Sequence, residues 1–211
     1  SIDVYTQILS SNYYSPELYY NLGICHYNKK DLGRAVLNFK RALKYDPSMV
    51  NAQVNIETIK SEQVNSIYEV EPFFMGKIWT DLSNAMPSVI WAIVSILLLL
   101  GLTYLIYLFL FKIDAYRVNN LKTGIALVFL LLIVSFLAAN KRTNTLTTDK
   151  HAIILQETKR YAGPDEKSVV EEDLIPEGTE VIILEELSGW YKVSLPDLDH
   201  VWMTAEMFER I

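Results

Sequence analysis

Two long stretches of the chain lack the polar positions that mark one side of a surface helix. Residues 82–111 are thirty consecutive residues without a charged side chain, and residues 123–140 are eighteen more. A helix needs roughly 20 apolar residues to cross a bilayer, whereas an amphipathic helix of a soluble protein repeats polar residues about every three to four positions. The pattern therefore predicts a membrane protein with two spans, at about 89–111 and 123–139, joined by a loop at 112–122.

Residues 15–47 show the helical period with a polar side. Ser15 is suited to cap a helix that begins with Pro16, and Asp31 is suited to cap a second helix that Pro47 ends. Small and large residues recur along both helices at packing positions, namely Tyr19, Leu22, Gly23, His26, Ala35, Phe39 and Ala42. The pattern predicts a helix–turn–helix hairpin.

This hairpin resembles a tetratricopeptide repeat, a helix–turn–helix unit of 34 residues. Gly23 and Ala35 stand at the small positions that let the two helices approach, and Phe39 stands at the large position beside them. Only His26 departs from the pattern, because an aromatic residue is usual there. The resemblance implies an all-α repeat region over residues 1–66.

Tetratricopeptide hairpins bury their faces by stacking on one another, so they occur in series. Residues 1–11 fit the second helix of a preceding repeat, and residues 50–60 fit the first helix of a following one. The pattern begins within a repeat and without Met, so we expect further residues before Ser1, including another repeat or a signal peptide.

The first helix of a repeat presents a face on which partner proteins bind. The resemblance assigns four residues to this face, and apolar and aromatic groups there suit a helix or an extended peptide of another protein. The alternative is that these residues pack on a neighbouring helix of the stack. The four are Tyr20, Ile24, Tyr27 and Asn28.

Residues 67–87 lie directly before the first span and have an apolar face of their own. An amphipathic helix in this place is typical of a segment that lies in the membrane interface. A capping helix at the end of the repeat stack is the alternative. The candidates for contact with the interface are Phe74, Ile78, Trp79 and Leu82.

After the second span the period changes from helical to extended. Segments at 151–155, 179–184 and 190–195 are β-branched or aromatic and are separated by Gly and Pro turns. Short strands at such spacing predict a small all-β barrel or sandwich over residues 150–211.

Several residues of this region resemble a bacterial SH3-like domain. They are Gly189-Trp190-Tyr191-Lys192-Val193 and Val201-Trp202, with His200 where that family usually has Gly. The resemblance implies a groove at Trp190 and Tyr191. The pattern favours an exposed Trp190 and a buried Trp202, and the alternative places both in the core.

Charge is distributed as unevenly as hydrophobicity. The 211 residues carry 19 basic and 25 acidic side chains, a net charge of −6. Residues 151–211 alone hold 5 basic and 14 acidic side chains, a net charge of −9. This acidity argues against a nucleic-acid partner, which would require a basic surface, and it favours a basic protein partner through electrostatic steering.

Residues that could carry catalysis are sparse. Cys25 and His26 are neighbours in a helix and point about 100° apart, so they cannot form a nucleophile–base pair, and Cys25 reads as a packing residue. His151 and His200 show no metal-binding spacing with it. We expect no enzymatic activity, no cofactor and no metal.

The order of repeats, two spans and an SH3-like domain resembles the E-protein family of the Bacteroides aerotolerance (Bat) operon. This resemblance implies a multidomain protein of the bacterial inner membrane, with a transmembrane hairpin at 88–140. It implies partners among membrane and periplasmic proteins, namely von Willebrand A-domain proteins and, indirectly, a MoxR-type AAA+ ATPase. The basic loop between the spans and the usual location of bacterial SH3-like domains favour a periplasmic location for both soluble regions.

Two functions follow as hypotheses. The first is a non-catalytic adaptor that binds partner proteins through its repeats, its spans and its SH3-like domain. The second is an envelope receptor whose SH3-like domain binds peptidoglycan or a wall peptide. The short loop offers little surface for signalling across the membrane, which favours the adaptor.

Overall fold

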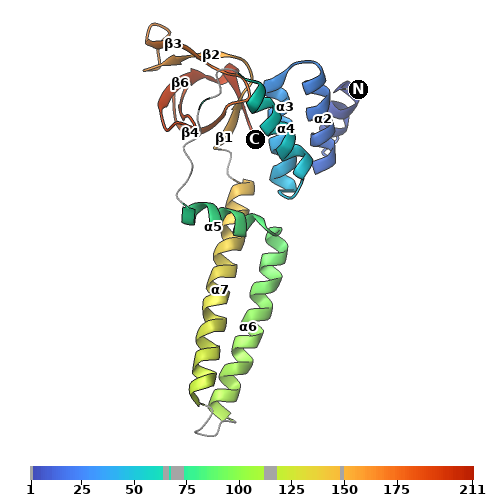
Figure 1. Cartoon of the computed structure of the whole chain (residues 1–211), viewed down its shortest axis with the longest axis vertical. Helices are drawn as coiled ribbons and strands as arrows, with labels where there is room; N and C mark the ends of the chain where they lie inside the picture. The colour runs from blue at the N-terminus through green and yellow to red at the C-terminus, as the bar shows by residue number, and fades with distance from the viewer. Residues whose placement is uncertain (1, 64–66, 68–73, 112–117, 148–149) are drawn as a thin grey trace. The chain divides into compact units, whose positions relative to one another are not determined.

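The computed structural model describes residues 2–63, 67, 74–111, 118–147 and 150–211, except the side chains of 118, 145–147 and 171–173. The chain forms two compact units (Figure 1). One unit combines Ser1–Pro72 with Thr148–Ile211, and the other is Phe73–Thr147. Most of the predicted loop at 112–122 and part of the predicted segment at 67–87 therefore lie outside the described residues.

The repeat region is helical, as predicted. Ser15 accepts a hydrogen bond from the backbone N–H of Leu18, and Asp31 accepts one from that of Arg34, so both predicted N-caps are confirmed. The helices are α1 (Ile2–Ser10), α2 (Pro16–Asn28), α3 (Leu32–Tyr45) and α4 (Val50–Glu62).

The contact between α2 and α3 depends on a glycine, Gly23, which has no side chain. A Cβ atom on Gly23 would lie 2.6 Å from Cε1 of Phe39, whose side chain is fully buried. Ala35 is fully buried beside it. The small and large positions of the hairpin pattern thus pack as expected, because the Phe39 ring occupies the space that any larger residue at position 23 would need.

His26, which departs from the repeat pattern, has a structural role. Its Nδ1 lies 3.0 Å from Oδ2 of Asp31, the residue that caps α3. Burial acts to raise the pKa of Asp31, but hydrogen bonds from Arg34 and His26 outweigh it and hold the pKa below its usual range. The imidazole therefore ties the end of α2 to the start of α3.

The C-terminal region is one antiparallel sheet of seven strands. Their order is β3-β2-β6-β5-β4-β1-β7, and the sheet curls around its own apolar face (Figure 1). The strands are β1 (His151–Ile154), β2 (Thr158–Tyr161), β3 (Val169–Ile175), β4 (Glu180–Leu187), β5 (Trp190–Ser194), β6 (His200–Thr204) and β7 (Phe208–Arg210), with a 3-10 turn η2 (Ala205–Met207).

The all-β prediction is confirmed at the level of an antiparallel sheet, but the sheet does not close into a hydrogen-bonded barrel. Its two edges are β3 and β7. Sequence patterning missed β2 and β3, because β2 is only four residues long and both strands carry charged residues where the pattern requires apolar ones.

Tight turns set the register of the central strands. Ser188 and Gly189 have positive φ angles of 52° and 82° between the paired residues Leu187 and Trp190. Two consecutive positive φ values make the type I′ turn that suits a two-residue hairpin. The turn before His200 contains Leu198 at a φ of 70°, and His200 itself pairs with Ser194 as the first residue of β6.

Strand β1 is apolar after its exposed first residue, His151, because both of its faces are covered from Ala152 to Ile154. Ala152 and Ile154 belong to the core inside the curled sheet, whereas Ile153 faces the opposite way and is fully buried among helical residues that include Val36. A strand that is buried on both faces has a continuous apolar sequence instead of an alternating one. The repeat helices and the sheet are thus parts of one compact unit.

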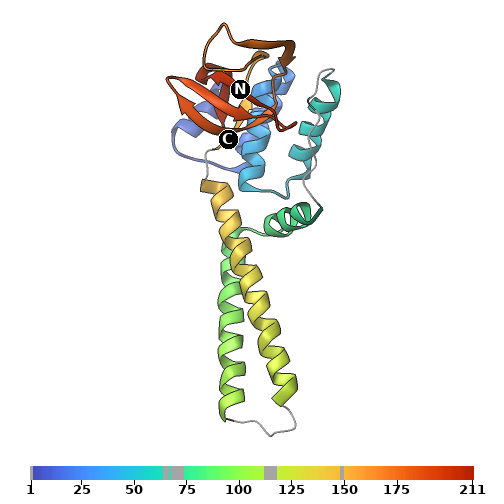
Figure 2. The ribbon, with the colours of Figure 1, turned by 90° about the vertical axis from the view of Figure 1, so that its left-hand side faces the viewer.

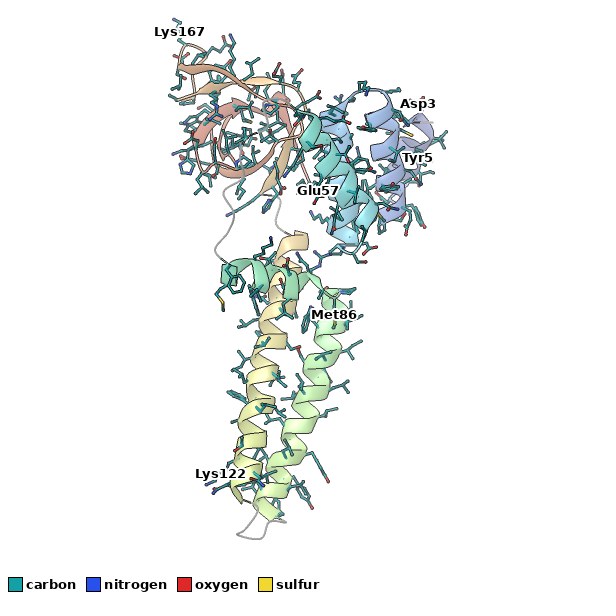
Figure 3. The ribbon with its side chains drawn as sticks, in the orientation of Figure 1. Asp3, Tyr5, Glu57, Met86, Lys122 and Lys167 are labelled. Atoms are coloured by element: carbon teal, nitrogen blue, oxygen red, sulfur yellow. The ribbon has the colours of Figure 1, made fainter. Side chains whose placement is uncertain are left out.

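The second unit is a helical hairpin, in which α5 (Phe74–Asn84) packs on α7 (Val118–Thr147) and α7 lies along α6 (Ser88–Phe111; Figure 2). Met86 and Lys122 mark the two ends of the hairpin (Figure 3). Two helical stretches, Ser88–Phe111 and Asn119–Asn144, are long and apolar enough to span a membrane. The two predicted spans are therefore confirmed in length and composition.

Hydroxyl groups join the two long helices. Oγ of Ser95 lies 2.9 Å from Oγ of Ser135, and Ser135 donates across the contact to the backbone oxygen of Trp91. The indole N–H of Trp91 donates to the backbone oxygen of Ser83. Interhelical hydrogen bonds of this kind hold helices together where water is absent.

We predict that Gly23→Ala destabilises the first unit by about 1–3 kcal/mol, the usual cost of forcing extra volume into a packed core. The thermal midpoint of the full chain in mild detergent, followed by near-ultraviolet circular dichroism, measures the effect. Gly163→Ala is the matched control, because its added Cβ would have Ser168 Oγ as its nearest neighbour, at 3.8 Å. Equal midpoints for the two variants would contradict the packing described for Phe39.

Candidate functional site

Three surfaces are candidates for binding: the junction of α3 with the sheet, the α2–α4 face of the repeat, and a hollow beside Trp190. The junction contains ion pairs between the helix and the sheet. Lys40 Nζ donates to Oε2 of Glu180 at 2.5 Å, and Nδ1 of His151 lies 3.0 Å from Oε1 of the same carboxylate. One carboxylate of β4 is thus held between a cation of α3 and an imidazole of β1.

A second ion pair lies farther along α3. Arg41 Nη2 donates to Oε1 of Glu209 at 2.8 Å and to the backbone oxygen of Arg210 at 2.7 Å. Four basic residues and no acidic one lie within α3, which reads LGRAVLNFKRALKY. The basic side of α3 contacts the acidic sheet. Part of the basic partner that the net charge of −9 predicts is therefore α3 of the same chain.

The charge environment changes the acidity of Glu180. Burial acts to raise the pKa of its carboxyl group, but the charge of Lys40 and the hydrogen bonds from His151 and Lys40 outweigh burial. The pKa therefore lies well below its usual range. Glu180 remains ionised at any pH near neutral, which makes it a structural clamp and not a proton donor.

Two glycines allow the backbones to meet at the junction. A Cβ on Gly33 would lie 2.5 Å from the backbone oxygen of Leu155. Gly178 has a φ of 80°, and a Cβ there would lie 3.1 Å from Cγ2 of Val36. Between them, the carboxylate of Glu177 accepts a hydrogen bond from the Gly33 N–H at 3.0 Å. Side chains larger than hydrogen at these glycines would push the helix off the sheet.

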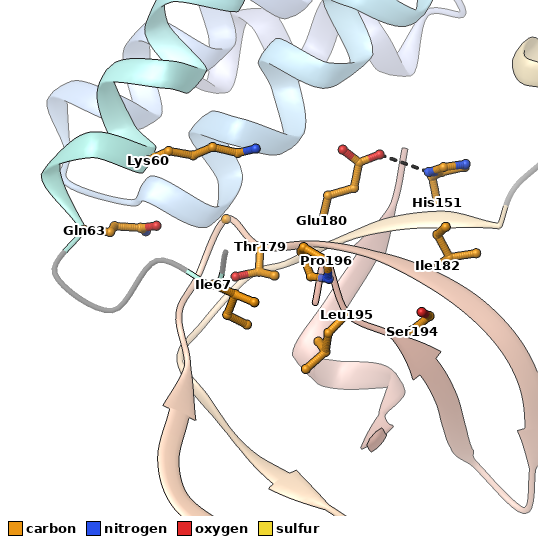
Figure 4. A pocket seen from close by; sticks show the side chains of 11 residues that line it. Lys60, Gln63, Ile67, His151, Thr179, Glu180, Ile182, Ser194, Leu195 and Pro196 are labelled. Carbon is orange, nitrogen blue, oxygen red and sulfur yellow. Dashed lines mark hydrogen bonds and ion pairs between the residues drawn. The ribbon is translucent and has the colours of Figure 1, made fainter. Parts of the chain in front are cut away.

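A hollow of about 200 Å³ opens beside this junction (Figure 4). Lys60 reaches over it from α4, and His151 and Glu180 face each other across one wall (Figure 4). Ser194 and Pro196 also line it. Within the described part of the chain, no group of three or more His, Cys, Asp or Glu side chains could hold a metal ion.

The structure places three of the four predicted residues of the repeat face together. Tyr20, Ile24 and Tyr27 are half-buried against the core that α3 and α4 share. The hydroxyl of Tyr20 accepts a hydrogen bond from Asn55, and that of Tyr27 donates to Glu62, so both reach α4. These residues therefore pack on a neighbouring helix and still line the exposed seam between α2 and α4.

The fourth predicted residue, Asn28, is exposed at the end of α2. Cys25 is half-buried in the same helix.

The predicted groove pair in the sheet does not share a face. Tyr191 packs edge-on against Phe208, with ring centroids 5.2 Å apart, and adjoins the sheet core. Trp190 points to the other face, where it meets Tyr161 edge-on at 5.3 Å. Successive residues of a strand alternate between faces, so Tyr161 and not Tyr191 is the partner of Trp190.

The predicted burial of Trp202 is wrong. Trp202 is half-buried and pairs with Lys192 of β5, which lies on the same face as Trp190 two residues earlier. Its neighbours in the strand, Val201 and Met203, fill the core instead. Strand alternation would have shown this, because residues 201 and 203 cannot face inward together with residue 202.

Trp190 and Tyr161 line a hollow on the outer face of the sheet. Thr158, Lys159 and Val169 line it from β2 and β3, Gly189 lines it from the turn before β5, and Thr204 lines it from β6. An indole beside a cation and hydroxyl groups suits a peptide or sugar chain that offers both an apolar surface and hydrogen-bonding groups. Sequence patterning missed the contribution of Tyr161, because it had not recognised β2.

The predicted interfacial residues lie on one helix of the second unit. Phe74, Ile78 and Leu82 of α5 are exposed, and Trp79 is half-buried. The three exposed residues recur at four-residue spacing and so form one apolar stripe. A helix with such a stripe next to two apolar helices fits an interfacial location.

Comparison with known protein families gives a match for one segment of the chain. Residues 16–49 match the tetratricopeptide repeat family. A comparison with curated proteins gave no match, and a comparison with solved structures gave none. The matched segment comprises α2 and α3 and the turn that leads to α4; the N-cap of α2, Ser15, lies just before it.

We predict that Glu180→Gln lowers the stability of the first unit at pH 7 by about 2 kcal/mol, the contribution of hydrogen bonds to a charged group. A carboxyl group whose pKa is depressed on folding stabilises the fold above its ordinary pKa of 4.5 and loses that contribution as the pH falls. The difference between wild type and variant should therefore shrink below about pH 4.5.

Thermal midpoints of the full chain between pH 3 and pH 7 measure this difference. Glu185→Gln is the matched control, since it neutralises an exposed carboxylate of the same strand. A constant gap between wild type and Glu180→Gln over that pH range would show that Glu180 is not the clamp described here.

Proposed function

We propose that this chain is a membrane-anchored adaptor without catalytic activity, which holds partner proteins in a complex of the bacterial inner membrane. The observation that carries the proposal is the tetratricopeptide match at residues 16–49. Hairpins of this family build extended surfaces on which other proteins bind. The seam between α2 and α4, lined by Tyr20, Ile24 and Tyr27, is the surface that fits this role.

The sheet already covers one side of α3, which supports the choice of the seam between α2 and α4 as the binding surface. The side of α3 that faces away from α2 is covered by the sheet through Lys40, Arg41 and Gly33. The seam between α2 and α4 has no such cover among the residues that the structure describes. An adaptor built this way offers one face of its repeat to partners and uses the other to fix its second domain.

Anchoring in the membrane is supported by the two apolar stretches, Ser88–Phe111 and Asn119–Asn144. Only 11% of each hydrophobic window is buried within the chain. Side chains this apolar and this exposed require a nonaqueous environment or a partner. In the arrangement we propose, both soluble regions lie in the periplasm and the loop lies in the cytoplasm.

The resemblance to the E-protein family of the Bat operon supports the choice of partners. It points to von Willebrand A-domain proteins of the same membrane and, indirectly, to a MoxR-type AAA+ ATPase. The SH3-like assignment of residues 150–211 belongs to the same proposal. Its support is the motif around Trp190, which lies on a type I′ hairpin in an antiparallel sheet.

A tagged full-length chain purified in mild detergent should retain membrane proteins in stoichiometric amounts, identified by mass spectrometry. Tyr27→Ala should lower this retention by about tenfold, because truncation of a central aromatic residue removes a large share of the contact energy of an interface. Tyr13→Ala is the matched control, since Tyr13 is an exposed tyrosine in the turn before α2. Recovery of the chain alone in several detergents would overturn the adaptor proposal.

The hollow beside Trp190 favours a second candidate, an envelope receptor that binds a peptidoglycan peptide or glycan. If that function holds, the detergent-solubilised full chain should sediment with purified sacculi, and Trp190→Ala should abolish sedimentation. Leu198→Ala, which truncates an exposed apolar residue in the turn before β6, should leave it unchanged. Equal sedimentation of all three proteins would exclude this hollow as the wall-binding site.

A further inference from the structure

The hollow beside Trp190 differs from the hollow at the junction in how its polar side chains are satisfied. At the junction, the carboxylate of Glu180 is already held by Lys40 and His151. The hollow beside Trp190 has a volume of about 630 Å³, within the range of small-molecule sites. Several polar side chains that line it have no partner among the residues that the structure describes, so they are available to a ligand.

Thr158 is the most buried of these side chains. It lines the hollow, although only 6% of its surface is exposed. Its hydroxyl makes no hydrogen bond to any described residue. A buried hydroxyl without a partner is unfavourable, and such groups are normally satisfied by protein or by ordered water. The partner of Thr158 therefore has to come from the hollow, either as water or as a ligand that displaces the water.

The two aromatic rings of the hollow form a corner. Trp190 and Tyr161 are both half-buried, and their ring planes meet at 70° with centroids 5.3 Å apart. Neither the indole N–H nor the phenol hydroxyl makes a hydrogen bond within the described part of the chain, although both groups usually have a partner when they are buried. The corner therefore offers an apolar ring face beside unused hydrogen-bonding groups.

Charged side chains of both signs line the same hollow. Glu166 lies in the turn between β2 and β3, Glu206 lies in η2, and Lys159 lies in β2. None of these three side chains forms a hydrogen bond or an ion pair with another residue that the structure describes. Together they give the hollow two strong acceptors and one strong donor that the fold does not use.

This mixture of donors and acceptors selects the class of ligand. A lysine or arginine side chain would match the two carboxylates but would leave Lys159 and the indole N–H without an acceptor. An extended peptide binds by adding to a free strand edge, whereas Trp190 lies on β5, which already pairs with β4 and β6. A pyranose ring has an apolar face of C–H groups for the indole, and each of its hydroxyl groups both donates and accepts.

We propose that the hollow beside Trp190 binds a saccharide chain, with one pyranose ring stacked on the indole. Hydroxyl groups of that ring bond to Thr158, Glu166 and Glu206, and Lys159 donates to a ring or acetamido oxygen. The inference rests on the second candidate function put forward above and narrows its ligand from a wall peptide or glycan to the glycan. Thr158 is then a specificity-determining residue, because its buried hydroxyl is satisfied only when the sugar offers a hydroxyl at that point.

Fluorine NMR of full chains labelled with fluorotryptophan, in a detergent whose head group is not a sugar, tests the site. The chain has 4 tryptophans, and Trp190→Phe assigns the signal of interest. Chitotetraose should shift that signal in a saturable way. Thr158→Val, which keeps the shape of the side chain and removes the hydroxyl, should weaken binding about tenfold, the effect of one hydrogen bond. It should not lower the thermal midpoint, since no hydrogen bond within the described residues is lost.

Thr179→Val is the matched control. Thr179 is buried to nearly the same extent as Thr158, but its hydroxyl donates to the backbone oxygen of Pro176. This variant should therefore lower the thermal midpoint and leave chitotetraose binding unchanged. Equal chitotetraose binding by wild type and Thr158→Val, or a Trp190 signal that chitotetraose does not shift, would overturn the saccharide site.

Sedimentation with purified sacculi separates this inference from the receptor candidate. Sedimentation that excess chitotetraose prevents supports both. Sedimentation that chitotetraose does not prevent, without a shift of the Trp190 signal, refutes the saccharide site alone, and a shift of that signal by the wall stem peptide would identify the peptide as the ligand. A shift by chitotetraose without sedimentation refutes the wall receptor and retains the saccharide site.

Discussion

The packing of α3 against β1 is the contact on which the first unit depends. Helix α3 packs on α2 through Ala35 and Phe39, and it contacts the sheet through Val36 and Lys40. Nearly its whole circumference is therefore buried or paired, which is unusual for a helix that carries four basic residues. Because β1 is likewise covered on both faces, loss of this contact would expose apolar surface on both partners at once.

The same contact changes what the acidity of the C-terminal region means. Read from sequence, a net charge of −9 over residues 151–211 points to an external basic partner. In the folded chain, Glu180 and Glu209 are already matched by Lys40 and Arg41. The charge that remains available for steering is therefore smaller than the sequence suggests, and binding of a partner depends more on shape and apolar contact.

Local features were predictable where the physical cause is local. The caps at Ser15 and Asp31, the small residue at Gly23 and the length of the two apolar helices each follow from neighbouring residues and were confirmed. Docking of α3 on the sheet was not predicted, because it joins segments more than a hundred residues apart, although two signals were visible: the charged residues of α3 are all basic, and the helix contains Gly33. The Trp190 site was half predicted, since its partner Tyr161 lies on a strand too short and too charged to be recognised.

The contact between repeat and sheet has a functional consequence. The seam between α2 and α4 and the hollow beside Trp190 belong to one compact unit, joined by ion pairs and by backbone contacts at Gly33 and Gly178. A partner that touches both surfaces does not have to order a flexible linker, so its second contact costs little additional entropy. Two modest surfaces on one compact unit can then bind as tightly as one large surface, which is the property that the proposed adaptor needs when neither surface is deep.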